Sequence, residues 1–190
     1  MIRLIGIGSP FGDDAAGLEV ARLLAKAPPP SCEVIAADRP GTALVDLLEG
    51  ADTAILIDAV RSGAPPGTIH EFAFDELDRH TARFVSSHDL GVVAAIQLAQ
   101  KLGRAPCVGR VIGIEIAPGS MARFCGLSAG TREAMCRAVE RVRSAAGEFD
   151  DRQRERLVRS GTVQGAGKPE LPAAAAVAFR RGRQRSNHDP

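Results

Sequence analysis

Short apolar runs alternate along the chain with segments whose apolar residues repeat at helical spacing. The run at 53–57 is continuous and predicts a central strand that is buried on both faces and ends at Asp58. Strands that alternate with helices predict an α/β fold with three layers, in which helices cover both faces of a mostly parallel, twisted sheet. The predicted strands are 1–8, 33–37, 53–57, 67–74 and 108–116, and the predicted helices are 13–26, 42–48, 90–102 and one that begins at 128.

The apolar pattern fades beyond residue 147. We therefore predict one folded domain over residues 1–147 and a basic tail, rich in Gly, Pro and Ala, over residues 148–190. The charged residues are also distributed unevenly between the predicted domain and the predicted tail. Residues 1–150 contain 15 Lys and Arg against 19 Asp and Glu, whereas the last 40 residues contain nine against four. Such a composition predicts a disordered, solvated terminus.

Composition also excludes several classes of protein. No apolar run has the length of a membrane span, and Met1 leads directly into a strand, so we expect neither a membrane segment nor a secretion signal. The chain lacks Trp and Tyr, which leaves few aromatic platforms for single-stranded nucleic acid. The four cysteines have no Cys-x-x-Cys spacing, which favours reduced thiols in a cytoplasmic protein.

Two adjacent aspartates follow the first predicted strand. A glycine-rich turn at residues 8–12 leads to Asp13 and Asp14 at the start of the first helix. A carboxylate at a helix N-terminus meets free amide groups and a favourable dipole, so capping explains one aspartate. The second adds repulsion between like charges, and capping explains it less well.

Three residues are expected at the edge of the sheet where its parallel strands end. Asp14 follows the first strand, Asp58 ends the central strand, and His88 precedes a predicted helix. Ligands of open parallel sheets bind at this edge. Two carboxylates and an imidazole suit a divalent ion such as nickel, zinc or manganese, or a general base with its partners. The alternative is that Asp58 caps a turn and His88 starts a helix.

The other histidines have no comparable neighbours in the predicted arrangement. His70, His80 and His188 are therefore expected on the surface.

Three short motifs resemble the signatures of the [NiFe] hydrogenase maturation endopeptidases. The first is Gly-Ile-Gly-Ser-Pro-Phe-Gly-Asp-Asp-Ala-Ala-Gly at residues 6–17, the second is Leu-Ile-Asp-Ala at 56–59, and the third is Ser-His-Asp-Leu-Gly at 87–91. Residues 113–115 and 126–128 resemble the later strand and the start of the last helix in that family. The resemblance spans residues 1–145 in the family's order.

This resemblance implies a function and a site. Family members have a phosphorylase/hydrolase-like fold and act as endopeptidases of aspartic type. They remove a C-terminal peptide from the hydrogenase large-subunit precursor after nickel has been inserted. Carried over by motif, the residues that approach the nickel and serve catalysis are Asp14, Asp58 and His88. The resemblance further implies that the substrate supplies the nickel and that no organic cofactor, nucleic acid or membrane takes part.

A turn that the family uses to recognise its substrate has a loose counterpart here. It implies that Asp38, Gly41 and Thr42 contact the precursor. Two departures concern the first motif: Ser9 stands where Asn is common, and the turn before Asp13 is shorter.

Alternative functions remain at this point. Three glycines at positions 6, 8 and 12 approximate a dinucleotide-binding fingerprint, but Asp13 and Asp14 place negative charge where a pyrophosphate would bind. The opening also resembles peptidyl-tRNA hydrolases, without the histidine and asparagine that follow there. A chaperone-like protein that binds the precursor without cutting it would retain the same residues.

Overall fold

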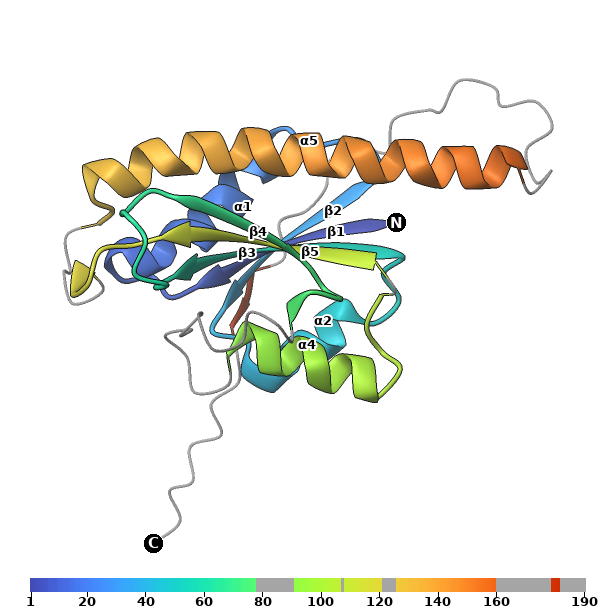
Figure 1. The fold of residues 1–190 in the computed structure, drawn as a ribbon, viewed down its shortest axis with the longest axis horizontal. Coiled ribbons are helices and arrows are strands. Elements are labelled where there is room, and N and C mark those ends of the chain that lie inside the picture. Colours follow the sequence, from blue (N-terminus) through green and yellow to red (C-terminus); the bar gives the residue numbers. More distant parts are fainter. Residues whose placement is uncertain (78–90, 107, 121–125, 160–178, 182–190) are drawn as a thin grey trace, which may run out of the picture.

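The fold is described by a computed structural model over residues 1–77, 91–106, 108–120, 126–159 and 179–181. Six strands form one sheet in the order β4-β5-β3-β1-β2-β6, and every pairing is parallel except that of β4 with β5. The mostly parallel sheet predicted from the sequence is therefore confirmed (Figure 1). The strands are β1 (Ile2–Gly8), β2 (Cys32–Asp38), β3 (Thr53–Val60), β4 (Ile69–Ala73), β5 (Val108–Glu115) and β6 (Phe179–Arg181).

Helices cover both faces of the sheet, which gives the predicted three layers. One face packs against α1 (Ala16–Lys26) and α5 (Ala129–Arg159), and the other packs against α2 (Leu44–Leu48) and α4 (Val92–Lys101) (Figure 1). Two apolar clusters fill the spaces between the layers. All eight residues of β3 are buried, as expected for a central strand.

The first helix lies unusually close to the sheet because glycines face each other across the contact. A Cβ atom added to Gly17 of α1 would lie 2.1 Å from the carbonyl oxygen of Ile7 and 2.4 Å from that of Ile57. A Cβ atom on Gly6 would lie 2.1 Å from the carbonyl oxygen of Gly17. Because these are backbone atoms, no rotamer change relieves the overlap. The close approach fixes the start of α1 over the ends of β1 and β3.

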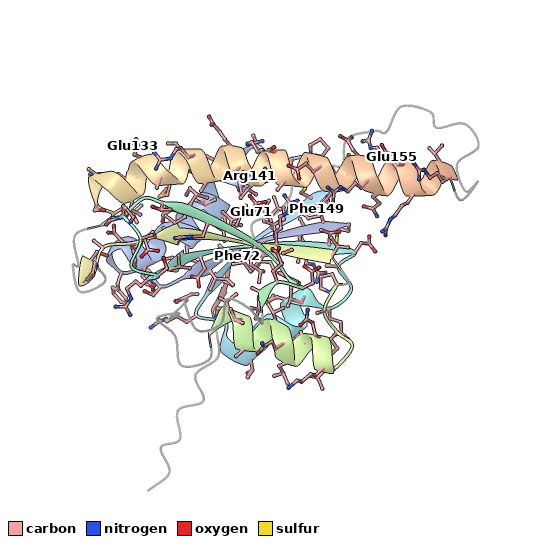
Figure 2. All side chains as sticks on the ribbon, in the orientation of Figure 1. Glu71, Phe72, Glu133, Arg141, Phe149 and Glu155 are labelled. Carbon is pink, nitrogen blue, oxygen red and sulfur yellow. The ribbon has the colours of Figure 1, made fainter. Side chains whose placement is uncertain are left out.

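The last helix does not stop where the apolar pattern fades. It continues through residue 147 to Arg159, so the predicted domain boundary falls inside α5. Phe149 is buried against the sheet, and the Arg110 guanidinium lies 5.0 Å from its ring centroid. Glu148 of α5 forms ion pairs with Arg110 of β5 at 2.9 Å and with Arg141 at 3.1 Å. Arg141 in turn binds Glu71 of β4 at 2.5 Å, and Figure 2 shows Glu71, Arg141 and Phe149 between the helix and the sheet. Burial and ion pairs thus hold a segment that its polarity alone assigns to a tail.

Other boundaries differ from prediction by a few residues. The central strand continues past Asp58 to Val60, because residues 53–60 all pair with β5. Within the predicted tail, residues 179–181 add a short strand to the edge of β2, where open backbone groups are available. The remaining tail residues, 160–178 and 182–190, lie outside the described part of the chain.

Within the described part of the chain, no helix has the length and apolar character needed to span a bilayer.

Candidate functional site

Asp14 and Asp58 lie together where the central strands end. Asp14 belongs to a short 3-10 turn, η1 (Gly12–Ala15), directly after β1, and Asp58 lies in β3, the strand next to β1. Their side chains are buried, with 1% and 2% exposure. The Asp58 Oδ1 atom accepts a hydrogen bond of 2.9 Å from the backbone N–H of Ala59. The structure therefore brings together two of the three residues predicted to form the site.

The two carboxylates interact electrostatically. Burial raises the pKa of Asp58 well above its usual range, and the negative charge of Asp14 raises this pKa further. The hydrogen bond from Ala59 acts in the opposite direction and is outweighed. A buried pair of like charges is relieved by a proton on one member or by a cation between them. The pair is thus suited to proton transfer and to binding a cation.

The neighbouring aspartate has a different role. Asp13 is also buried, but its Oδ1 atom accepts a hydrogen bond of 2.6 Å from the backbone N–H of Ser128, next to the start of α5. Its Oδ2 atom makes no hydrogen bond among the described residues. Asp13 thus links the first turn to the last helix, which accounts for one aspartate structurally. Asp14 is the aspartate whose charge acts on Asp58.

Glycine shapes the turn that carries Asp14. A Cβ atom on Gly8 would lie 2.1 Å from the Asp14 carbonyl oxygen, so no side chain fits there. The backbone N–H of Ser9 donates a hydrogen bond of 3.3 Å to the same oxygen. These contacts hold the turn against the end of β1.

The predicted substrate turn lies at the same edge of the sheet. Asp38 ends β2 and pairs in register with Gly8, whose carbonyl oxygen accepts a 2.9 Å hydrogen bond from the Arg39 N–H. The Asp38 carboxylate also accepts a bond of 2.8 Å from Arg39 Nε. Gly41 has φ +51° with open space around it, and Thr42 is exposed. The turn therefore presents accessible atoms near the carboxylate pair.

The remaining predicted ligand, His88, lies outside the described residues. Within the described ranges, no group of three or more His, Cys, Asp or Glu side chains is arranged to hold a metal ion. Of the three predicted ligands, the structure therefore describes only Asp14 and Asp58.

A second polar cluster was missed by the sequence analysis. Glu115, at the end of β5, is buried, and its carboxylate accepts hydrogen bonds from the backbone N–H groups of Ser62 and Gly63 at 2.8 and 3.0 Å. His70 of β4 lies 3.0 Å from Glu115 through Nε2. His70, expected on the surface, is therefore partly buried and paired, because β4 is antiparallel and brings it beside Gly113. His80 and His188 lie outside the described residues.

The raised pKa of Asp58 leads to a prediction about stability. The folded state holds the Asp58 proton more tightly than the unfolded chain does, so this proton stabilises the fold most at a pH below the unfolded pKa, near 3.8. The stabilisation is lost as the pH rises through the pKa that Asp58 has in the folded state. Asp58→Asn keeps an oxygen for Ala59 and removes the charge. At neutral pH we expect the melting temperature of the variant to lie several degrees above that of the wild type, because each kcal/mol of added stability raises it by about 2–4 °C.

Thermal unfolding between pH 4 and pH 8, in the presence of a chelator, measures this difference. The gap between variant and wild type should narrow toward pH 4. A variant that is less stable than the wild type throughout would contradict the repulsion between Asp14 and Asp58.

Comparison with known proteins shows which family the chain resembles. The family model for hydrogenase maturation proteases matches residues 18–145. The hydrogenase expression/formation protein HupD of Thiocapsa roseopersicina is 29% identical over 187 residues, which cover 96% of this chain and 82% of that protein.

Solved structures show the same fold. The maturating endopeptidase HybD of Escherichia coli superposes with a TM-score of 0.68 at 24% identity, over 78% of this chain and 93% of that one. A hydrogenase 2 maturation peptidase from a thaumarchaeon has a TM-score of 0.56 at 29% identity, over 77% and 97% of the two chains. From the family match, which spans most of the folded part, we conclude that this chain belongs to the hydrogenase maturation protease family.

Proposed function

We propose that this protease removes a C-terminal peptide from the nickel-loaded precursor of a [NiFe] hydrogenase large subunit, and that Asp14 and Asp58 meet the nickel of that substrate. The observation that carries the proposal is the buried pair of carboxylates at the sheet edge, whose charges repel each other. A divalent cation that enters with the substrate relieves this repulsion. Carboxylate oxygen is an established ligand for such ions.

Peptide hydrolysis at this site requires one proton to be moved. A water oxygen bonds to the scissile carbonyl carbon, and a carboxylate of the pair accepts a proton from that water. The C–N bond then breaks, and the proton passes to the nitrogen of the leaving peptide. We propose an aspartic-type assignment on this basis, because the two carboxylates provide both an acceptor and a donor when one of them is protonated.

The remaining residues are proposed from the motifs. His88 is proposed as a third contact with the nickel. Asp38, Gly41 and Thr42 are proposed to contact the precursor, and their position at the same sheet edge supports this. In this proposal the nickel belongs to the substrate, and the protease uses no organic cofactor.

We also propose that the protein acts in the cytoplasm. Cys32 and Cys136 are free thiols in the described part of the chain, which fits a reducing compartment. Burial, together with the charge of Asp150, raises the pKa of Cys32 to about 11, so this thiol has little tendency to react.

Incubation with purified large-subunit precursor tests the function. Intact mass spectrometry is expected to show loss of a C-terminal peptide from the nickel-loaded precursor and no change in a nickel-free preparation. Precursor that is bound but remains full length would instead indicate a chaperone-like protein. Equal cleavage of both preparations would contradict the role given to nickel.

A further inference from the structure

The C-terminal half of α5 forms one side of a hollow at the amino ends of β3 and β5. Figure 1 shows this helix continuing past the ends of the strands. The hollow has a volume of about 800 Å³, and its lining includes Thr53 and Val108, the first residues of the two strands. Asp58 lies five residues beyond Thr53 in β3, roughly 16 Å away at about 3.3 Å per residue. The hollow is therefore separate from the carboxylate pair.

The face of α5 that packs on the sheet changes its character along the helix. Ala145 and Phe149 are buried on this face, four residues apart. The same spacing of three and four residues continues with Arg152, Arg156 and Arg159, all of which line the hollow. Arginines thus replace apolar residues on this face where the helix leaves the sheet.

These three arginines, the arginine stripe, form no side-chain hydrogen bond or ion pair within the described part of the chain. Arg154 differs, because it binds Asp150 at 3.0 Å. Members of the stripe are three or four residues apart, so neighbouring guanidinium groups repel each other along the helix. The helix dipole favours cations in the last turn, which accounts for Arg156 and Arg159 but not for Arg152. An anionic occupant of the hollow would relieve the repulsion.

The acidic residues around the hollow do not neutralise the stripe. The Asp52 carboxylate binds the amino group of Met1 and accepts a hydrogen bond of 3.2 Å from Gln153 Nε2. Among the described lining residues, that leaves the carboxylate of Glu155, near the end of α5 (Figure 2). Val108 adds apolar surface, with 36% exposure. The hollow therefore has an excess of positive charge beside an apolar floor.

We propose that this hollow binds an acidic, amphipathic segment of a partner protein. Its carboxylates pair with the arginine stripe, and its aliphatic side chains rest on Val108. Guanidinium groups match carboxylates in bidentate geometry, and arginine is enriched at protein interfaces. Sites of about 300–1,000 Å³ enclose ligands of drug size, so about 800 Å³ has room for several side chains of a peptide.

Nucleic acid suits this surface less well than an acidic peptide. The carboxylate of Glu155 repels phosphate groups, whereas a peptide can offer it a backbone N–H. The chain also lacks Trp and Tyr, on which the bases of a single strand would stack. The partner is therefore inferred to be a protein.

Fluorescence anisotropy with the full chain tests the surface. The probe is a labelled peptide composed of Glu and Leu, and its counterpart carries Gln in place of every Glu. The wild type should bind the acidic peptide and not the Gln peptide, and added salt should weaken binding because it screens exposed charges. Replacing Arg152 and Arg156 together by Gln should weaken binding about tenfold, since each exposed ion pair contributes up to roughly fivefold.

Arg132→Gln combined with Arg154→Gln is the matched control. Both arginines are exposed on α5 and lie outside the lining of the hollow, so this variant loses the same charge from the same helix. Its affinity for the acidic peptide should stay close to that of the wild type. Methyl NMR then locates the peptide: the signals of Val108 should shift during titration, and those of Val60, two residues beyond Asp58, should not.

Four outcomes would overturn the proposal. The wild type could fail to bind the acidic peptide, or the shifts could occur at Val60 instead of Val108. An equal loss of affinity in the two double variants would show a general attraction to basic residues. Tighter binding of a single-stranded oligonucleotide than of the acidic peptide would indicate nucleic acid. None of these measurements involves cleavage, so their results are independent of the proposed function.

Discussion

Replacement of Asp14 or Asp58 by Asn should lower the rate of precursor cleavage by about 10²–10⁴-fold, the usual contribution of a general acid or base. Both carboxylates are buried at the same sheet edge, and the charge of Asp14 acts directly on Asp58. Asparagine preserves size and one oxygen but cannot accept the proton from water. Single-turnover cleavage of nickel-loaded precursor, followed by intact mass, measures the effect.

Asp13→Asn is the matched control for this experiment. Asp13 is the direct neighbour of Asp14 and is equally buried, but its Oδ1 atom is used by the Ser128 N–H. Asparagine retains an oxygen for that bond, so cleavage should stay within a few-fold of wild type. If Asp13→Asn lost activity and Asp14→Asn retained it, Asp13 and not Asp14 would be the catalytic aspartate.

The largest effect on folding is expected from Gly17→Ala. The added methyl group would overlap the carbonyl oxygens of Ile7 and Ile57 at 2.1 and 2.4 Å, so α1 would have to move away from both central strands. We expect destabilisation above about 4 kcal/mol, which is exceptional for a single substitution and in a domain of this size leaves little folded protein. Urea unfolding and soluble yield measure the loss.

Gly147→Ala is the corresponding control within a helix. Gly147 is exposed on α5, and nothing lies within 4 Å of an added Cβ atom. Alanine at this position should stabilise the protein by about 0.5–1 kcal/mol, because it restricts the unfolded chain. If Gly17→Ala were as stable as this control, α1 would not rest on the backbone of the sheet as described.

Much of the fold follows from the pattern of apolar residues. A continuous apolar run such as 53–57 is stable only between two covering layers, so β3 was predictable as a central strand. The proximity of Asp14 and Asp58 was also predictable. Asp14 follows β1, Asp58 lies near the carboxyl end of β3, and β1 and β3 are parallel neighbours in the sheet.

Other features depend on contacts that local sequence does not reveal. The division of roles between Asp13 and Asp14 requires Ser128, which lies 115 positions away in the chain. His70 reaches Glu115 only because β4 runs antiparallel beside β5. Residues 148–159 are too polar to show a helical apolar stripe, and ion pairs such as Arg154 with Asp150 at 3.0 Å support the helix there.

The family match also decides among the functions that the sequence left open. It favours a maturation protease over a dinucleotide-binding protein or a peptidyl-tRNA hydrolase. The buried aspartates agree with this, because they place negative charge at the start of α1, where a pyrophosphate would need free amide groups.

Nickel X-ray absorption can show whether Asp14 and Asp58 bind the metal of the substrate. The spectrum of a nickel-loaded precursor, altered at the cut so that it cannot be cleaved, is recorded alone and in complex with the wild-type chain. The carboxylate pair predicts additional oxygen ligands around the nickel in the complex, and their loss in a complex formed with the Asp58→Asn variant. An unchanged nickel spectrum in a stable wild-type complex would contradict the claim that Asp14 and Asp58 meet the metal of the substrate.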